Sequence, residues 1–125
     1  DLDESGKFRD DFRVTTWGRL FRKFWLEQHG PLVRQCAQVL KARKYVQSHT
    51  LDTPLNGYAQ QPRGTVEPYD GITELWWDNL EAVVAAHSSP EGQKANLLLA
   101  QDEARFCDLP RCSVFFTEEF TIFDQ

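Results

Sequence analysis

The sequence has few of the residues from which metal, nucleotide and redox sites are built. It contains three histidines, three cysteines and no methionine. None of the motifs Cys-x-x-Cys, His-Glu-x-x-His, a nucleophile elbow or a glycine-rich phosphate loop occurs. Metal binding needs clustered ligands, and the three histidines are far apart along the chain. We therefore expect neither a metal nor an organic cofactor.

Long apolar runs and a surplus of basic residues are missing as well. No apolar run approaches the roughly eighteen residues of a membrane span, so we expect no membrane partner. The net charge of −5 argues against nucleic acid as a partner. The odd cysteine count, without zinc-like spacing, indicates free reduced thiols in a cytoplasmic protein, although a Cys107–Cys112 bridge is geometrically possible.

The charges that are present divide unevenly along the chain. Residues 1–47 hold ten Lys and Arg against six Asp and Glu, a balance of +4. Residues 48–125 hold four against thirteen, a balance of −9. Chance distribution over one surface explains this division, and so does a self-association interface in which patches of opposite sign meet.

What the sequence does contain indicates one domain with an aromatic core. A chain of 125 residues can bury one sizeable core, so we expect a single domain over residues 1–125. Nine Phe and four Trp supply large apolar areas for that core.

The first half of the chain predicts a strand, a long helix and a second strand. Residues 7–14 (KFRDDFRV) alternate weakly between apolar and polar, which is a flawed strand pattern. Residues 17–41 predict an amphipathic helix that kinks or restarts at Pro31, because proline cannot donate to a carbonyl four residues back. Residues 43–51 (RKYVQSHTL) predict a strand. Three polar-tipped side chains share one face of it: Tyr45, Gln47 and His49.

The second half predicts a long loop, a strand, two helices and a last strand. Residues 52–70 are rich in Pro and Gly and show no helix or strand rhythm, so we expect a loop that acts as a mobile lid. Residues 71–78 predict a strand, and 79–87 and 89–106 predict helices. Residues 113–123 are apolar on both parities, which predicts a strand buried in the middle of a layered structure.

The order of these elements predicts an α+β fold. It is the ferredoxin-like βαββαβ pattern, an antiparallel sheet with two helices on one face. The other face carries aromatic side chains that a lone sheet would expose to water, so we expect a second copy to cover it. Such a homodimer should bury at least roughly 1,000 Å² in total.

Several stretches of the chain resemble the EthD-domain family, which belongs to the dimeric α+β barrel superfamily. The resemblance covers about residues 17–123 and follows the family's order of elements. The matching stretches are HGPL at 29–32, RKYVQSHTL at 43–51, PYDGITELWWDNLEA at 68–82, SPEG at 89–92 and FFTEEFTI at 115–122. The chain departs from the family at residues 1–16, where members usually open with a smooth hydrophobic strand and this chain has an atypical first strand.

The resemblance implies a family with varied chemistry. Members and relatives include cofactor-free dehydratases, cyclases and isomerases, cofactor-independent monooxygenases, and proteins without an assigned activity. Six residues of this chain fall on family motif positions: His29, Tyr69, Asp70, Gly71, Glu74 and Trp76.

Four residues are candidates for proton transfer: His29, His49, Tyr45 and Glu74. His29 lies at the helix break before Gly-Pro, where it can turn into a pocket or simply hydrogen-bond the carbonyls that Pro31 leaves unpaired. His49 and Tyr45 can line a cavity or belong to an ordinary half-exposed strand face. Glu74 lies between apolar neighbours, where burial would raise its pKa, or it is a structural carboxylate.

We expect the substrate to be a small hydrophobic, oxygenated or aromatic compound. Dehydration, isomerisation or cyclisation by cofactor-free proton transfer is the leading hypothesis, and a cofactor-independent monooxygenase or accessory protein of a catabolic pathway is the second. A non-catalytic small-molecule binding protein is the third. The expected substrate-binding residues are Trp25, Gln47, Tyr69, Trp76, Phe106 and Phe116.

Overall fold

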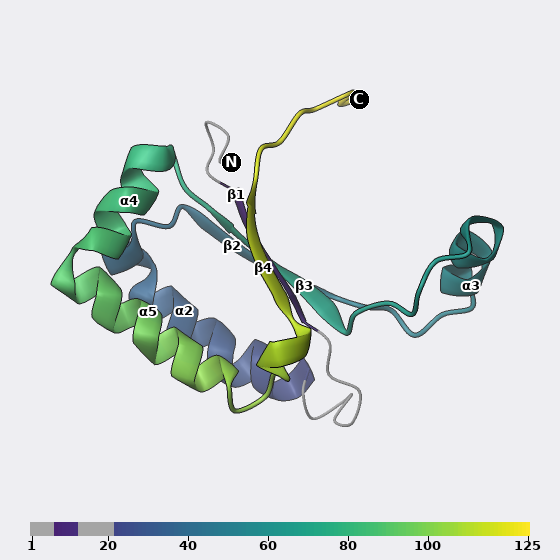
Figure 1. Cartoon of the computed structure of the whole chain (residues 1–125), viewed down its shortest axis with the longest axis horizontal. Helices are drawn as coiled ribbons and strands as arrows, with labels where there is room; N and C mark the ends of the chain where they lie inside the picture. The colour runs from purple at the N-terminus through teal and green to yellow at the C-terminus, as the bar shows by residue number, and fades with distance from the viewer. Residues whose placement is uncertain (1–6, 13–21) are drawn as a thin grey trace.

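The computed structural model describes residues 7–12 and 22–125, and within them a four-stranded sheet carries helices on one face (Figure 1). The strands are β1 (Lys7–Phe12), β2 (Lys44–His49), β3 (Gly71–Trp76) and β4 (Ser113–Thr117). Their order in the sheet is β2-β3-β1-β4, and all neighbours are antiparallel. The helices α2 (Gly30–Leu40), α4 (Leu80–Ser88) and α5 (Pro90–Glu103) cover one face. This arrangement confirms the predicted ferredoxin-like α+β fold.

The helix that contains Pro31 runs on through the proline and is not broken there. The backbone is helical from residue 22 to residue 40, and its turn η1 (Trp25–His29) is π-helical. The backbone N–H of Gly30 donates to the carbonyl of Trp25, five residues back. Pro31 follows in the first turn of α2, where its missing N–H costs little. The predicted break is therefore a widened turn just before the proline.

The two later helices begin at side-chain caps. Asn79 accepts a hydrogen bond from the backbone N–H of Ala82 at 2.8 Å at the start of α4. Ser89 accepts one from the N–H of Gly92 at 2.9 Å at the start of α5, and Pro90 occupies the first turn. Such caps satisfy backbone donors that have no partner within the helix.

The segment 52–70 is not free of regular structure, so that prediction was wrong. It contains the helix α3 (Leu55–Gln60) and the 3-10 turn η2 (Gln61–Arg63), which Figure 1 shows extending away from the rest of the chain. Gly57 and the prolines mask the helical pattern, because both residues are poor helix formers.

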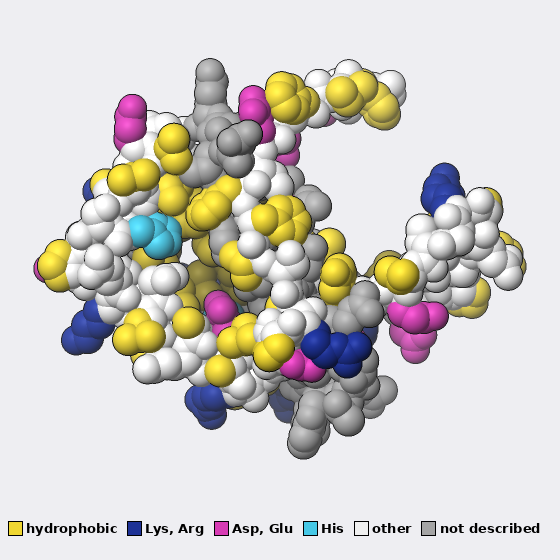
Figure 2. All heavy atoms as spheres, in the orientation of Figure 1, with side chains coloured by type: hydrophobic (Ala, Val, Ile, Leu, Met, Phe, Trp, Pro, Cys, Tyr) yellow, Lys and Arg dark blue, Asp and Glu magenta, His cyan; other side chains and the backbone are white. Residues whose placement is uncertain are grey.

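The last strand is shorter and more exposed than predicted. β4 ends at Thr117 and lies at an edge of the sheet, so the prediction of a central strand buried on both faces was wrong. Phe115 and Phe116 are each 39% exposed, and Phe120, Ile122 and Phe123 beyond the strand are exposed as well. Figure 2 shows hydrophobic side chains gathered over β4 and the C-terminal segment. An apolar sequence indicates that its side chains need to be buried, but it does not show whether the same chain or another chain buries them.

The core lies between the helices and the sheet. Five buried residues of α2 and α5 form one cluster, against which Tyr45 and Leu75 of the sheet pack: Val33, Cys36, Leu40, Ala95 and Leu99. The Trp77 indole N–H donates to the Leu40 carbonyl at 2.7 Å and links β3 to the end of α2. Cys36, Cys107 and Cys112 are free thiols.

Candidate functional site

The sheet separates the predicted site residues into two groups. In the β2–β3 register Tyr45 pairs with Leu75 and Gln47 with Thr73, and these side chains face the helices. Val46 pairs with Glu74, one residue out of phase, so Glu74 lies on the opposite face. Trp76 lies on that face too, with the Lys44 ammonium 5.5 Å from its ring centre. Within one chain, Glu74 and Trp76 therefore do not join the helix-facing groups.

A hydrogen-bonded row runs along the helix-facing side of β2. The Gln47 side-chain nitrogen donates to the Tyr45 hydroxyl at 2.9 Å and to the backbone carbonyl of Trp25 at 2.8 Å. The Gln47 side-chain oxygen lies 2.9 Å from Nε2 of His49. Because an amide oxygen can only accept, Nε2 of His49 carries a hydrogen and Nδ1 of the neutral ring carries the lone pair. The row thus fixes both the tautomer of His49 and the direction of the Tyr45 hydroxyl.

The widened turn supplies the acceptor that holds this row against the helix. The Trp25 carbonyl accepts from both the Gly30 N–H and the Gln47 side chain. Trp25 is fully buried, and its indole stacks on the His49 ring with centroids 4.3 Å apart and planes at 22°. The aromatic residue that begins the widened turn therefore positions two members of the row.

The environment holds Tyr45 and His49 in their neutral forms. Burial raises the pKa of Tyr45 to about 12, although its hydrogen bond with Gln47 opposes this. Since the Tyr45 oxygen accepts from Gln47, its own hydrogen can be donated to another group. Burial lowers the pKa of His49, and the positive charge of Arg22 lowers it further. At neutral pH the row thus presents a hydrogen-bond donor and a neutral imidazole.

His29 has the opposite electrostatic environment. It is 2% exposed, its Nδ1 lies 2.7 Å from a carboxylate oxygen of Asp102, and its Nε2 lies 3.6 Å from Glu103. Burial alone would lower the pKa of His29, but hydrogen bonds and negative charges from Glu103 and Asp102 outweigh it and raise the pKa above 6.5. His29 therefore neither points to solvent nor caps the helix carbonyls.

Asp102, the hydrogen-bond partner of His29, was not among the site residues predicted from the sequence. It lies three residues after Leu99 on the apolar stripe of α5, and a carboxylate in that position is a signal of a buried partner. Phe106 also packs here, with its ring 5.0 Å from His29 and 5.3 Å from Phe24.

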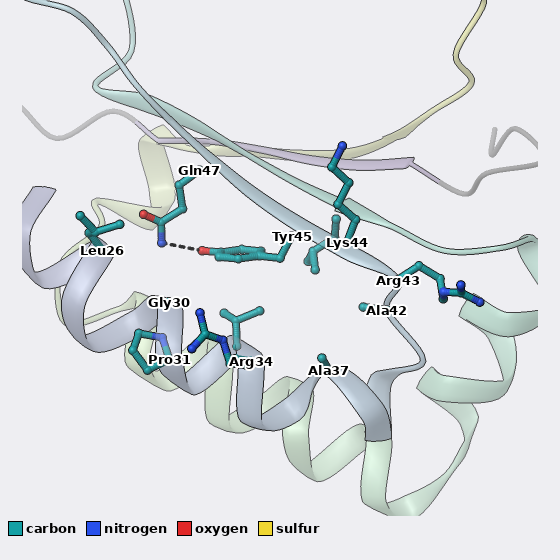
Figure 3. A pocket seen from close by; sticks show the side chains of 12 residues that line it. Leu26, Gly30, Pro31, Arg34, Ala37, Ala42, Arg43, Lys44, Tyr45 and Gln47 are labelled. Carbon is teal, nitrogen blue, oxygen red and sulfur yellow. Dashed lines mark hydrogen bonds between the residues drawn. The ribbon is translucent and has the colours of Figure 1, made fainter.

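A cavity of about 460 Å³ lies between the helix and β2 (Figure 3). The helix side of the cavity includes small residues, because Gly30 has no side chain and Ala37 has only a methyl group. Tyr45 and Gln47 form part of the opposite wall. Figure 3 shows the Tyr45 ring lying across the cavity with its hydroxyl toward Gln47.

The other predicted residues lie outside the described lining of this cavity. His29, His49 and Trp25 lie next to it without lining it, and no residue of segment 52–70 contributes to it. The carbonyl of Tyr69 accepts from the Thr50 hydroxyl at the entrance to β3, and Phe116 packs 6.5 Å from Trp77. The position of segment 52–70 gives no support to a lid over this cavity.

The described part of the chain holds no group of three or more His, Cys, Asp or Glu arranged to bind a metal ion. Across residues 7–12 and 22–125, no helix is long and apolar enough to cross a membrane.

Comparison with known proteins places these observations in a family. The model of the EthD domain family matches residues 19–110. The solved structure of an EthD family protein from Bacillus halodurans is similar, with 16% identity and a TM-score of 0.64 over 93% of this chain and 99% of that one. No curated protein matches the chain.

Two further solved structures share the fold. SnoaB, a cofactor-independent oxygenase from Streptomyces nogalater, has 11% identity and a TM-score of 0.52 over 97% of this chain and 99% of that one. A dimeric ferredoxin-like protein from Jannaschia has 14% identity and a TM-score of 0.56 over 91% of this chain and 98% of that one. At these identities the likeness concerns the fold.

Proposed function

The chain belongs to the EthD domain family, and from this membership and the geometry of the site we propose that it acts on a small hydrophobic, oxygenated compound by cofactor-free proton transfer. The observation that carries the proposal is the row Tyr45–Gln47–His49, of which the first two members line the cavity. The cavity has the volume of a small-molecule site and a mainly apolar wall with a few polar groups.

Tyr45 is the residue that we propose contacts the substrate oxygen. Its hydroxyl is oriented by Gln47 and stays protonated well above neutral pH, so it can donate a hydrogen bond to a carbonyl. A donor fixed in a partly buried site stabilises the negative charge that develops on that oxygen when a neighbouring carbon loses a proton.

His49 is the proposed proton acceptor. Its lowered pKa keeps the imidazole neutral, and Nδ1 carries the lone pair that takes the proton. If the proton returns to a different carbon, the product is an isomer. If the proton and a hydroxyl group of the substrate leave together as water, the reaction is a dehydration. In this proposal His29 has a structural role, because it is held as a buried cation by two carboxylates.

The experiment measures loss of deuterium to water from aryl ketones that are deuterated next to the carbonyl. We expect exchange by the wild-type protein and a decrease of roughly a hundredfold in both Tyr45→Phe and His49→Gln, the scale of one general acid–base group. His49→Gln can still donate to Gln47 but cannot take up a proton. Tyr58→Phe is the matched control, because Tyr58 is exposed on α3.

Other results would contradict the proposal in distinct ways. Ligand binding without exchange indicates a binding protein. Oxygen uptake during turnover indicates an oxygenase, the activity that the name of SnoaB gives for that protein. Unchanged exchange in Tyr45→Phe removes Tyr45 from the reaction.

We also propose that the protein is a homodimer. The open face of the sheet carries Ile72, Trp76 and Phe115, and exposed apolar residues continue beyond β4. The relative from Jannaschia is a dimeric ferredoxin-like protein. Sedimentation as a monomer at micromolar concentration would contradict the proposal.

A further inference from the structure

One solvent-exposed cation of the helix, Arg34, lines the cavity. Arg34 lies one helical turn after Gly30, on the same face of α2, and both line the cavity. Figure 3 shows the Arg34 side chain rising from α2 beneath the Tyr45 ring, beside Pro31. The guanidinium is thus placed on the side of the cavity that faces Tyr45 and Gln47.

The two other cations of the cavity wall are engaged elsewhere. Arg43 donates to the Asp78 carboxylate at 3.0 Å, and Figure 3 shows its side chain directed away from Tyr45. The Lys44 ammonium lies over the Trp76 ring, on the opposite face of the sheet. Arg34 is the cation of this lining for which the described residues supply no carboxylate or aromatic ring.

No protein anion neutralises Arg34 among the residues that the structure describes. None of the described lining residues is acidic, and no described carboxylate lies within ion-pair distance of Arg34. The rest of the lining is mainly apolar or small, and includes Leu26, Ala37 and Leu75. An arginine stays charged throughout the pH range of folded proteins, so Arg34 gives the cavity wall a positive charge that none of the described residues neutralises.

We propose that Arg34 binds the carboxylate of an apolar ligand, so that the substrate class of this cavity is a hydrophobic or aromatic carboxylic acid. The guanidinium matches a carboxylate with two parallel hydrogen bonds, and the apolar lining takes the hydrocarbon part. A second oxygen of the ligand, where present, meets the Tyr45 hydroxyl. This inference rests on the proposed function of the cavity and adds the charge of the molecule that enters it.

The experiment compares two probes of nearly equal shape, benzoate and benzamide, by isothermal titration calorimetry. Charged hydrogen bonds of this kind correspond to about a tenfold preference or more, so we expect benzoate to bind at least about tenfold more tightly than benzamide. Arg34→Gln should abolish this preference and leave benzamide binding unchanged. Arg34→Lys should restore part of it, because it keeps the charge but loses the two-pronged geometry. Arg63→Gln removes the same charge at an exposed position of η2 outside the cavity lining, so it is the matched control and should change neither affinity by more than about twofold.

Two further measurements separate failure of the subsite from failure of the cavity. Ala37→Phe should block the binding of both probes. NMR shift changes at the Tyr45 ring of the wild-type protein report binding in the cavity separately, so the test holds even if Ala37→Phe folds poorly. If both probes bind at Tyr45 with equal affinity and Arg34→Gln changes neither, the carboxylate subsite is wrong and the cavity stands. If benzoate does not shift the Tyr45 signals at ten-millimolar concentration, the order of the weakest specific binding, the subsite is wrong as well. If the probes bind Ala37→Phe as tightly as the wild-type protein and do not shift the Tyr45 ring signals, the cavity is not their binding site.

Discussion

His29 and His49 lie close to the same tryptophan but in opposite electrostatic environments. His29 follows Trp25 by four residues in the widened turn and is held by Asp102 and Glu103. His49 stacks on the Trp25 indole, forms no ion pair with a described carboxylate, and has its pKa lowered by the positive charge of Arg22. The pKa of the first is raised and that of the second is lowered.

The difference shows that residue type and position in the sequence do not determine the chemistry of a histidine. Both rings are partly or fully removed from water, which favours the neutral form. Two carboxylates reverse this preference at His29, and nothing comparable does so at His49 in the described part of the chain. A buried imidazolium stabilises structure, whereas a neutral imidazole can accept a proton.

The largest expected effect comes from removing the ring of His29. His29→Ala leaves the carboxylate of Asp102, which is 12% exposed, beside an empty space, so we expect the free energy of unfolding to fall by about 3 kcal/mol. Urea unfolding followed by circular dichroism measures it. His87→Ala is the control, because the His87 ring bonds one carbonyl of its own helix. A loss no larger than that of the control would contradict the structural role of His29.

A smaller effect is expected where Trp25 meets β3. A Cβ added at Gly71 would lie 2.4 Å from the Trp25 ring and 2.8 Å from the Ser48 carbonyl, so Gly71→Ala must displace the ring on which His49 stacks. We expect a loss of about 2 kcal/mol in the free energy of unfolding, the scale of overpacking, together with a shift of the His49 NMR signals. Gly57→Ala in α3 meets open space and serves as control. Equal stability of the two variants would show that Trp25 is loosely held.

The smallest effect is the pH dependence that each histidine gives to stability. The raised pKa of His29 means that its stabilisation is complete below pH 6.5 and is lost as the pH rises through the raised value. The lowered pKa of His49 means that its contribution is complete above pH 6.5 and is lost as the pH falls through the lowered value. NMR titration should place the two rings on opposite sides of 6.5. Asp102→Asn should lower the His29 pKa, and Arg22→Gln should raise that of His49.

If His29 and His49 titrate at the same pH, the difference between their electrostatic environments is contradicted. The same is true if Asp102→Asn leaves the His29 titration unchanged, because the pair with Asp102 would then have no electrostatic effect. A His49 that titrates well above pH 7 would be mostly charged at neutral pH and could not serve as the proposed base.

The sequence allowed the fold to be predicted because local patterns agreed with each other. Strand alternation, the apolar stripes of the helices and their order all indicate the same α+β arrangement. The edge position of β4 could not be predicted, because Phe115 and Phe116 are apolar whether their own chain or another covers them. The helix α3 was missed because its proline and glycine resemble loop residues.

The candidate site was predictable along one strand and not across the fold. The shared face of Tyr45, Gln47 and His49 follows from the two-residue period of a strand, and the structure brings them together as a row. That Glu74 lies on the opposite face of the sheet follows from the register between β2 and β3, and this register cannot be read from the spacing of residues in the sequence. The pairing of His29 with Asp102 joins residues 73 positions apart and depends on how the helices pack.

The π-helical turn at Trp25–His29 also has a consequence for how such chains are aligned. Each residue of an α-helix advances by about 100°, and a π turn contains one residue more than the α turn it replaces. The turn is therefore equivalent to a one-residue insertion that shifts the phase of everything before it. A homologue with a regular helix here has one residue fewer between the counterparts of Phe24 and Gly30. A comparison without that gap would pair the residues before Trp25 with positions on the wrong side of the helix.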